Sequence, residues 1–186
     1  VMCNLGLRYE HGLGVEQYGF QAFNWYQQGA QANNARSMCN LGWCYEKAIG
    51  VERDWVQALA WYEKGADAGD PNAMCNAGWC LENGWGSEKD PERACQRYQQ
   101  AADREDVRGI AMVGRCLQQG IGVERDETAA LSWFEKGAQM EDAGCLFCLG
   151  RAYEMGRRVE RDMEKALHRY QKSAAEGSFN AQYMLG

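Results

Sequence analysis

The sequence lacks any apolar run approaching the roughly 18 residues that a membrane-spanning helix needs, which predicts a soluble protein without direct membrane insertion. Basic residues are also in the minority. Lys and Arg number 20 against 26 Asp and Glu, so the formal net charge is −6. This balance disfavours nucleic acid and anionic membranes as partners, because both attract basic surfaces. No signal-peptide pattern follows Val1.

Recognisable catalytic motifs are missing as well. None of the serines is followed by a lysine three positions later, which excludes the Ser-x-x-Lys nucleophile. The Gly-x-Gly pieces recur at a fixed interval and are expected in turns rather than in a phosphate-binding loop. The closely spaced pair Cys145 and Cys148 supplies at most two of the four ligands of a structural zinc site, and His11 and His168 lie in other units. We therefore predict no enzyme activity, no catalytic residue and no cofactor or metal.

What the sequence has is an internal repeat of 36 residues. Alanine columns at this interval start at Ala22 and Ala30, and a glutamate column starts at Glu16. Without any insertion, the chain divides into units 1–36, 37–72, 73–108, 109–144 and 145–180, with residues 181–186 starting another. A period in this range is typical of helical repeat proteins. Glycine follows the same period at Gly6, Gly42, Gly78, Gly114, Gly150 and Gly186.

Each unit is expected to form two antiparallel helices. Apolar residues at helical spacing make one stripe before a glycine-containing loop and a second stripe after it. A single hairpin cannot bury both stripes, so neighbouring hairpins must stack. The predicted fold is all-α, a right-handed α/α superhelical solenoid of five 36-residue helix-hairpin repeats plus the start of a sixth. Aspartates stand at the expected N-caps of the second helices, at Asp54, Asp90, Asp126 and Asp162.

Three positions of the repeat are expected to set the packing within a hairpin. Counting from residue 1 of each unit, position 6 is glycine and position 22 is alanine, so two helices can approach closely there. Position 26 is Tyr or Phe and is expected to fill the space between the helices.

Three motifs of the second unit resemble the Sel-one-like repeat, a relative of the tetratricopeptide repeat. They are Leu41-Gly42-x-x-Tyr45, Gly50-Val51-x-x-Asp54 and Ala58-x-x-Trp61-Tyr62-x-Lys64-Gly65-Ala66. The resemblance covers essentially the whole chain, five times over. The departures from the pattern are Ala48 at a loop glycine, Gly86-Ser87 without the valine, Tyr18 at the capping aspartate and Arg157-Arg158 in place of Gly-x-Gly.

The resemblance implies a protein–protein interaction scaffold or adaptor that holds a partner polypeptide along a curved surface. We expect residues 1–186 to form a single repeat domain within a longer chain with flanking domains. This expectation depends on Leu185 and Gly186, which begin a first helix without its hairpin partner. Solenoids also need polar capping repeats at their ends.

The first helices are expected to line the concave groove. Positions 3, 7 and 10 lie roughly 120° from the buried stripe and would face it. Position 7 carries tryptophan in two adjacent units, and exposed tryptophan near arginine is typical of binding hot spots. Asparagine at position 4 offers both a donor and an acceptor to a ligand backbone. The predicted partner-binding residues are Asn40, Trp43, Glu46, Asn76, Trp79, Glu82, Arg115 and Arg151.

A second interpretation of the tryptophans stays open, in which Trp43 and Trp79 fold over the cysteine and glutamate rows and only cover the core. Three other tryptophans, Trp25, Trp61 and Trp133, occupy a consensus position of the second helix and are expected to pack.

The nine cysteines suggest an alternative function, a small-ligand, metal or redox-responsive protein. Equivalent positions in stacked repeats are about 8–10 Å apart, beyond disulfide reach, so cysteine is expected to act as a small buried hydrophobe. A secreted, cysteine-rich branch of the resembling family has a disulfide within each repeat, but this chain has Asp67 where the second cysteine of that pair would stand. The odd number of cysteines also favours free thiols in a reducing, cytoplasmic compartment.

Overall fold

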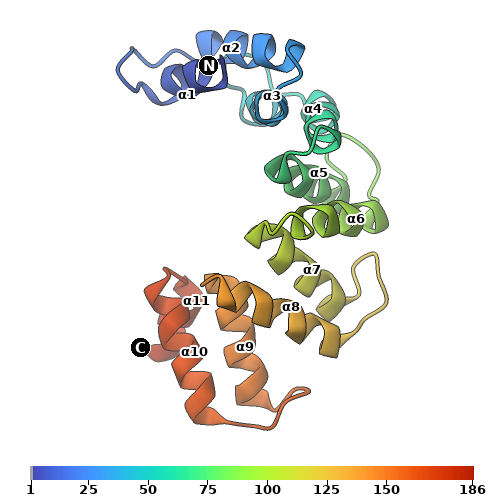
Figure 1. Ribbon diagram of the computed structural model, residues 1–186, viewed down its shortest axis with the longest axis vertical. Helices are drawn as coiled ribbons and strands as arrows, with labels where there is room; N and C mark the ends of the chain where they lie inside the picture. Colours follow the sequence, from blue (N-terminus) through green and yellow to red (C-terminus); the bar gives the residue numbers. More distant parts are fainter. Residues whose placement is uncertain (1) are drawn as a thin grey trace. The chain divides into compact units, whose positions relative to one another are not determined.

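The computed structural model describes residues 2–186, which form eleven helices and no strand. These residues divide into two compact units, one ending at Arg104 and the other beginning at Glu105. Figure 1 shows the helices following one another as hairpins within each unit. Unit 1 contains α1 (Met2–His11), α2 (Gly19–Gln31), α3 (Ala35–Lys47), α4 (Trp55–Asp67), α5 (Pro71–Asn83) and α6 (Pro91–Ala102). Unit 2 contains α7 (Val107–Gln119), α8 (Glu127–Gln139), α9 (Ala143–Met155), α10 (Met163–Ala175) and α11 (Phe179–Leu185).

The predicted N-caps are confirmed. Asp54, Asp90, Asp126 and Asp162 each accept hydrogen bonds from backbone N–H groups of the first turn of α4, α6, α8 and α10. The first helices α3, α5, α7 and α9 are capped in the same way, and Asp70 at α5 stands before Pro71 at the first helical position. At α2 the N-cap is Tyr18, whose side chain makes no capping bond.

The loop between the two helices of a repeat uses glycine at two positions, for two different structural reasons. The residue that ends a first helix adopts the left-handed conformation, as Gly84 does with φ 77° after α5. Ala48 stands at this place after α3 and adopts φ 59° although it has a Cβ. Gly50, two residues later, has φ 70°, and a Cβ there would lie 2.3 Å from the carbonyl oxygen of Gly19. Any other residue at position 50 would clash, because the loop packs directly against the start of the preceding second helix.

The expected packing role of the small residues is confirmed, and each position-6 glycine faces the aromatic ring at position 26 of its own hairpin. A Cβ added at Gly42 would lie 2.7 Å from the ring of Tyr62, so the missing side chain lets this ring pack directly against α3. The same close approach occurs between Gly114 of α7 and the Phe134 ring of α8 in unit 2. The position-22 alanines of the second helices are fully or almost fully buried, with 0–1% exposure at Ala22, Ala58, Ala94, Ala130 and Ala166.

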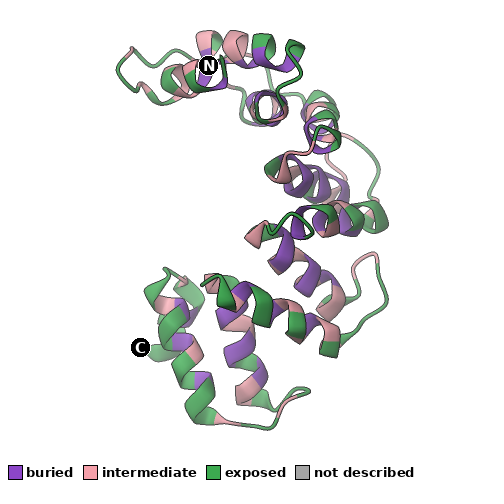
Figure 2. Ribbon diagram, viewed as in Figure 1, coloured by how far each residue is buried: buried purple, intermediate pink, exposed green. Residues whose placement is uncertain are grey.

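Burial follows the hairpin faces in both units. Figure 2 shows buried residues along the facing sides of the helices, with exposed residues on the loops and outer turns. In unit 1 each helix packs on the next, and the first helices α1, α3 and α5 also contact one another in sequence. These three helices form what we call the inner face of unit 1. No helix among residues 2–186 is both long and apolar enough to cross a bilayer.

Candidate partner-binding site

Trp43 and Trp79 are the largest side chains left open on the inner face of unit 1. They lie one repeat apart on α3 and α5, and 37% and 38% of their surfaces are exposed. Both rings are thus neither buried like core aromatics nor free of neighbours. What surrounds each ring differs between the two positions.

Trp43 is fixed from two sides by charged groups. Its indole Nε1 donates a hydrogen bond of 3.1 Å to Oε1 of Glu10 on the preceding first helix. The other oxygen of Glu10 accepts a 2.5 Å hydrogen bond from the hydroxyl of buried Tyr26. The ammonium of Lys47 lies 4.7 Å from the centroid of the Trp43 ring. The ring therefore has a defined orientation while more than a third of the residue stays exposed.

Trp79 belongs to an aromatic cluster instead. Its ring centroid lies 3.7 Å from that of Trp85, in the loop after α5, and 6.3 Å from that of Trp55 at the start of α4. Trp55 and Trp85 are 4.6 Å apart and are both half-buried. The cluster lies where the loop after α5 meets the start of α4. Trp85 and Trp55 were missed by the sequence reasoning, because no other unit has an aromatic residue at either of these repeat positions.

The predicted asparagines lie next to the tryptophans, half-buried between successive first helices. Asn40 Nδ2 is 3.5 Å from the sulfur of Cys3, and Asn76 Nδ2 is 3.7 Å from the sulfur of Cys39. Sulfur is a weak acceptor, so these amides lose little by turning to a stronger one. Asn40 and Asn76 can therefore offer polar groups to an incoming backbone.

The expected exposure of Glu46 is wrong. Glu46 is 6% exposed and accepts a 2.8 Å hydrogen bond from the hydroxyl of Tyr62, and its other oxygen pairs with Lys47 at 2.8 Å. Glu82 accepts in the same way from Tyr98 at 2.9 Å. The 120° count placed position 10 on the groove side, but a long side chain can turn back to the hairpin partner. Cys39 and Cys75 at position 3, also expected to face the groove, are buried as well.

This glutamate–tyrosine bond recurs between positions 10 and 26 in four of the five repeats, including Tyr170 with Glu154 at 2.7 Å in unit 2. The fourth repeat has Gln118 and Phe134 at the two positions. The acceptor carboxylate and the donor hydroxyl are thus replaced together. This joint change was visible in the sequence, and it could have shown that position 10 serves the core.

Arg115 and Arg151 take position 7 in unit 2. Arg115 on α7 is half-buried, and its Nη2 lies 3.5 Å from the sulfur of Met112. Arg151 on α9 is exposed, and its Nη2 lies 4.0 Å from the sulfur of Met155. Arg151 also lines a pocket of about 130 Å³ between α8 and α9.

The cysteines behave as core residues. None of the nine forms a disulfide within residues 2–186, and all except the half-buried Cys148 are buried. Burial, followed by the nearby Glu10 and Glu46 charges, raises the pKa of the Cys44 and Cys80 thiols to about 12. The protonated thiol is a poor nucleophile, which disfavours the redox alternative.

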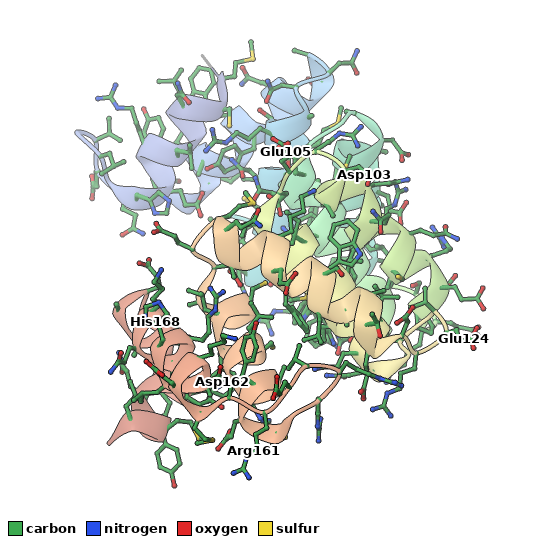
Figure 3. The ribbon with its side chains drawn as sticks, turned by 60° about the horizontal axis from the view of Figure 1, so that its bottom comes forward. Asp103, Glu105, Glu124, Arg161, Asp162 and His168 are labelled. Carbon is green, nitrogen blue, oxygen red and sulfur yellow. The ribbon has the colours of Figure 1, made fainter. Side chains whose placement is uncertain are left out.

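No group of three or more His, Cys, Asp and Glu side chains suited to a metal occurs among residues 2–186. His168 lies exposed on α10, and Figure 3 shows it on this helix, with Arg161 and Asp162 at the preceding loop.

Trp61 packs against the core of unit 1 beneath the Lys64 ammonium, as its expected packing role requires.

Comparison with protein-family models gives matches to the Sel1 repeat at residues 1–34, 35–70, 71–106, 107–142 and 145–178. The chain belongs to the Sel1 repeat family. The matched segments begin where the first helices α3, α5 and α7 begin, two residues before the sequence-based units. A comparison with curated protein sequences finds no match. Members of this family are generally non-enzymatic scaffolds for protein–protein interactions.

Several solved structures resemble the chain along nearly its whole length. A Sel1 repeat protein from Oxalobacter formigenes is 32% identical, with a TM-score of 0.91, over 97% of this chain and 72% of that protein. A protective antigen of uropathogenic Escherichia coli with an SLR fold is 30% identical, with a TM-score of 0.87, over 99% of this chain and 39% of the antigen. The immunity protein Pa5087 from Pseudomonas aeruginosa shares the fold at 22% identity, with a TM-score of 0.62, over 96% of this chain and 68% of that protein.

Proposed function

We propose that this Sel1 repeat chain is an adaptor that binds a partner polypeptide along its first helices. Trp43 and Trp79 are the apolar anchors in unit 1, Asn40 and Asn76 meet the partner's backbone, and position-7 arginines Arg115 and Arg151 contribute in unit 2. Glu46 and Glu82 support this surface from below by fixing the tyrosines of the hairpins. The half-open tryptophan pair on adjacent first helices carries the proposal.

The surroundings of Trp43 support this role. Its hydrogen bond to Glu10 and its contact with Lys47 hold the indole in one orientation before any partner arrives. A side chain that is already ordered loses less conformational entropy on binding, which favours affinity. Tryptophan is one of the residue types that are enriched among binding hot spots.

The proposal is tested by selecting a displayed library of random dodecapeptides on the immobilised chain. Affinities of the selected peptides are then measured for the wild type and for the double variant Trp43→Ala/Trp79→Ala. We expect the double variant to lose about 2 kcal/mol or more of binding free energy, which is a roughly 30-fold weaker affinity. Its melting temperature should fall less than that of a core variant, since more than a third of each tryptophan is exposed.

A matched control replaces two tryptophans of the second helices, Trp61→Ala/Trp133→Ala. These residues lie half-buried away from the first-helix surface, so their loss should lower stability and leave peptide affinity unchanged. Peptides that bind the Trp43/Trp79 double variant as tightly as the wild type would contradict the proposal. Lost stability with unchanged binding would assign the two tryptophans to the core.

A further inference from the structure

The surface between α8 and α9 in unit 2 departs from the repeat at several positions at once. Glutamate and tyrosine at positions 10 and 26 become Gln118 and Phe134 in the fourth repeat. Cysteine at position 3 and tryptophan at position 7, as found in the second and third repeats, become Phe147 and Arg151 in the fifth. Departures from a repeated pattern that coincide in space are expected at functional sites rather than at random.

A pocket results where these changes meet. Its volume is about 130 Å³, and its walls include Ala130, Phe134, Phe147, Cys148 and Ala152. A cavity of about 150 Å³ holds a benzene molecule, so this pocket accepts one branched aliphatic side chain of leucine size. Figure 1 shows that α8 and α9, which form it, are consecutive helices of the same unit.

Part of the pocket wall is apolar. Phe134 is buried and lacks the hydroxyl that its equivalents donate to glutamate. Burial raises the pKa of the Cys148 thiol to about 11, so the thiol stays neutral near pH 7. An uncharged thiol beside two aromatic rings is a favourable environment for an aliphatic group.

The rim of the pocket is positively charged. Arg151 and Arg157 line it, and neither forms an ion pair with a carboxylate of residues 2–186. The one carboxylate on the rim, Glu127, is already paired with Arg125 and lies 3.9 Å from Arg158. The rim thus attracts an anionic group placed next to the apolar occupant.

We infer that the α8–α9 pocket binds a partner polypeptide through a leucine-like side chain that is followed directly by an Asp or Glu. The aliphatic group fills the space against Phe134 and Phe147, and the carboxylate meets Arg151. This inference rests on the proposed function, because it assigns the chemistry of the partner segment that reaches unit 2.

The test uses the isotopically labelled chain and the probe N-acetyl-Leu-Asp-amide, whose only carboxylate is the aspartate side chain. We expect amide resonances of Phe147, Cys148 and Arg151 to shift with a millimolar dissociation constant. The neutral probe N-acetyl-Leu-Asn-amide should bind about three- to tenfold more weakly, since it lacks the charge-assisted hydrogen bond. No shift of these resonances at about 10 mM probe, or equal affinity for the two probes, would overturn the inference.

Two variants distinguish binding in the pocket from non-specific attraction of the anionic probe to arginine. Arg151→Trp restores the residue of the second and third repeats and should cover the pocket, which abolishes the shifts. Arg53→Ala removes an exposed arginine of unit 1 and should leave them unchanged. Arg151 is exposed, so its replacement is expected to preserve folding, checked by circular dichroism. Binding retained by Arg151→Trp would overturn the inference.

A third probe tests the source of the carboxylate. N-acetylleucine carries a terminal carboxylate directly on the leucine, and tighter binding of this probe would overturn the internal acidic residue in favour of a chain end. The Trp43→Ala/Trp79→Ala variant should bind the Leu-Asp probe normally. Failure of the pocket and failure of the tryptophan surface are thus distinguishable, because each has its own variant and its own ligand.

Discussion

The same positions of the repeat give a closed surface in unit 1 and an open pocket in unit 2. Between the first two repeats, Glu10 bridges Tyr26 and Trp43, so the space beside the hairpin is filled and hydrogen-bonded. Between the fourth and fifth repeats, Phe134 makes no such bond, and Arg151 leaves the space open. The same repeat backbone therefore supports two kinds of surface, the exposed Trp43/Trp79 pair in unit 1 and the α8–α9 pocket in unit 2. The side chains at four positions decide between them.

Alkaline pH should have the largest effect on the stability of unit 1. The pKa values of the Cys44 and Cys80 thiols are raised to about 12 in the folded chain, above the unfolded value of about 8.5. Burial and the bond to Glu46 also raise the pKa of Tyr62. A group with a raised folded pKa stabilises the fold fully below its unfolded pKa, and this contribution is lost as pH rises towards the folded value.

We therefore expect the melting temperature to fall steadily between about pH 9 and pH 11. Circular dichroism melts across this range provide the measurement. The Cys44→Ala/Cys80→Ala variant should show a shallower fall, and alanine is already present at the equivalent Ala152. An unchanged melting temperature at pH 11 would mean that these thiols are not held protonated by burial.

Overpacking the hairpin should be the next largest effect. Ala94 is fully buried between α5 and α6, so Ala94→Leu is expected to destabilise unit 1 by about 1–3 kcal/mol. Urea denaturation measures the change. Gln96→Leu on the same helix is the matched control, because Gln96 is exposed and should tolerate leucine. If Ala94→Leu unfolds like the parent, position 22 does not set the helix approach.

The glutamate–tyrosine bond can be tested as a pair. Tyr62→Phe leaves the buried Glu46 carboxylate without its hydroxyl donor and should cost about 1–3 kcal/mol. Adding Glu46→Gln copies the Gln118 and Phe134 combination of the fourth repeat and should recover part of that loss. A double-mutant cycle by denaturant unfolding gives the coupling energy. Additive effects of the two substitutions would show that the hydrogen bond is not what links these positions.

The smallest expected effects concern the loops. Ala48 in unit 1 and Arg158 in unit 2 adopt φ 59° and 56°, where the equivalent residues of the other repeats are glycine. Ala48→Gly and Arg158→Gly should each stabilise the fold by about 0.5–1 kcal/mol, since glycine has no steric penalty in this conformation. Gly84→Ala is the converse control and should destabilise. A loss of stability in Ala48→Gly would show that the left-handed conformation of Ala48 at the end of α3 is not strained.

The fold was largely predictable because its determinants repeat. Glycine and alanine columns, capping aspartates and apolar stripes each occur in four or more units, so the sequence predicts the helices and their pairing without any long-range information. The caps at Asp54 and Asp90 and the burial of Ala94 are confirmed. Such contacts reach only the neighbouring helix, which is why period and phase suffice to place them.

The candidate surface was less predictable, because it depends on where long side chains turn. The angular count placed Glu46 on the groove side, whereas its carboxylate folds back to Tyr62. Trp43 and Trp79 share a repeat position, yet one bonds to Glu10 and the other joins Trp85 and Trp55. Helical phase gives the direction of a Cβ, and the partners within reach decide the rest.

The amino-acid sequence by itself determined the 36-residue period, the two helices of each repeat, their caps and the small residues that let the helices touch. These features depend on local backbone preferences and on the facing helix, both encoded at fixed spacing. Only the tertiary structure decided that Trp43 bonds to Glu10 and Trp79 packs near Trp55, and that Gln118, Phe134, Phe147 and Arg151 meet at one pocket. Residues from two successive repeats create these features, so their effect depends on side-chain packing in three dimensions rather than on spacing along the chain.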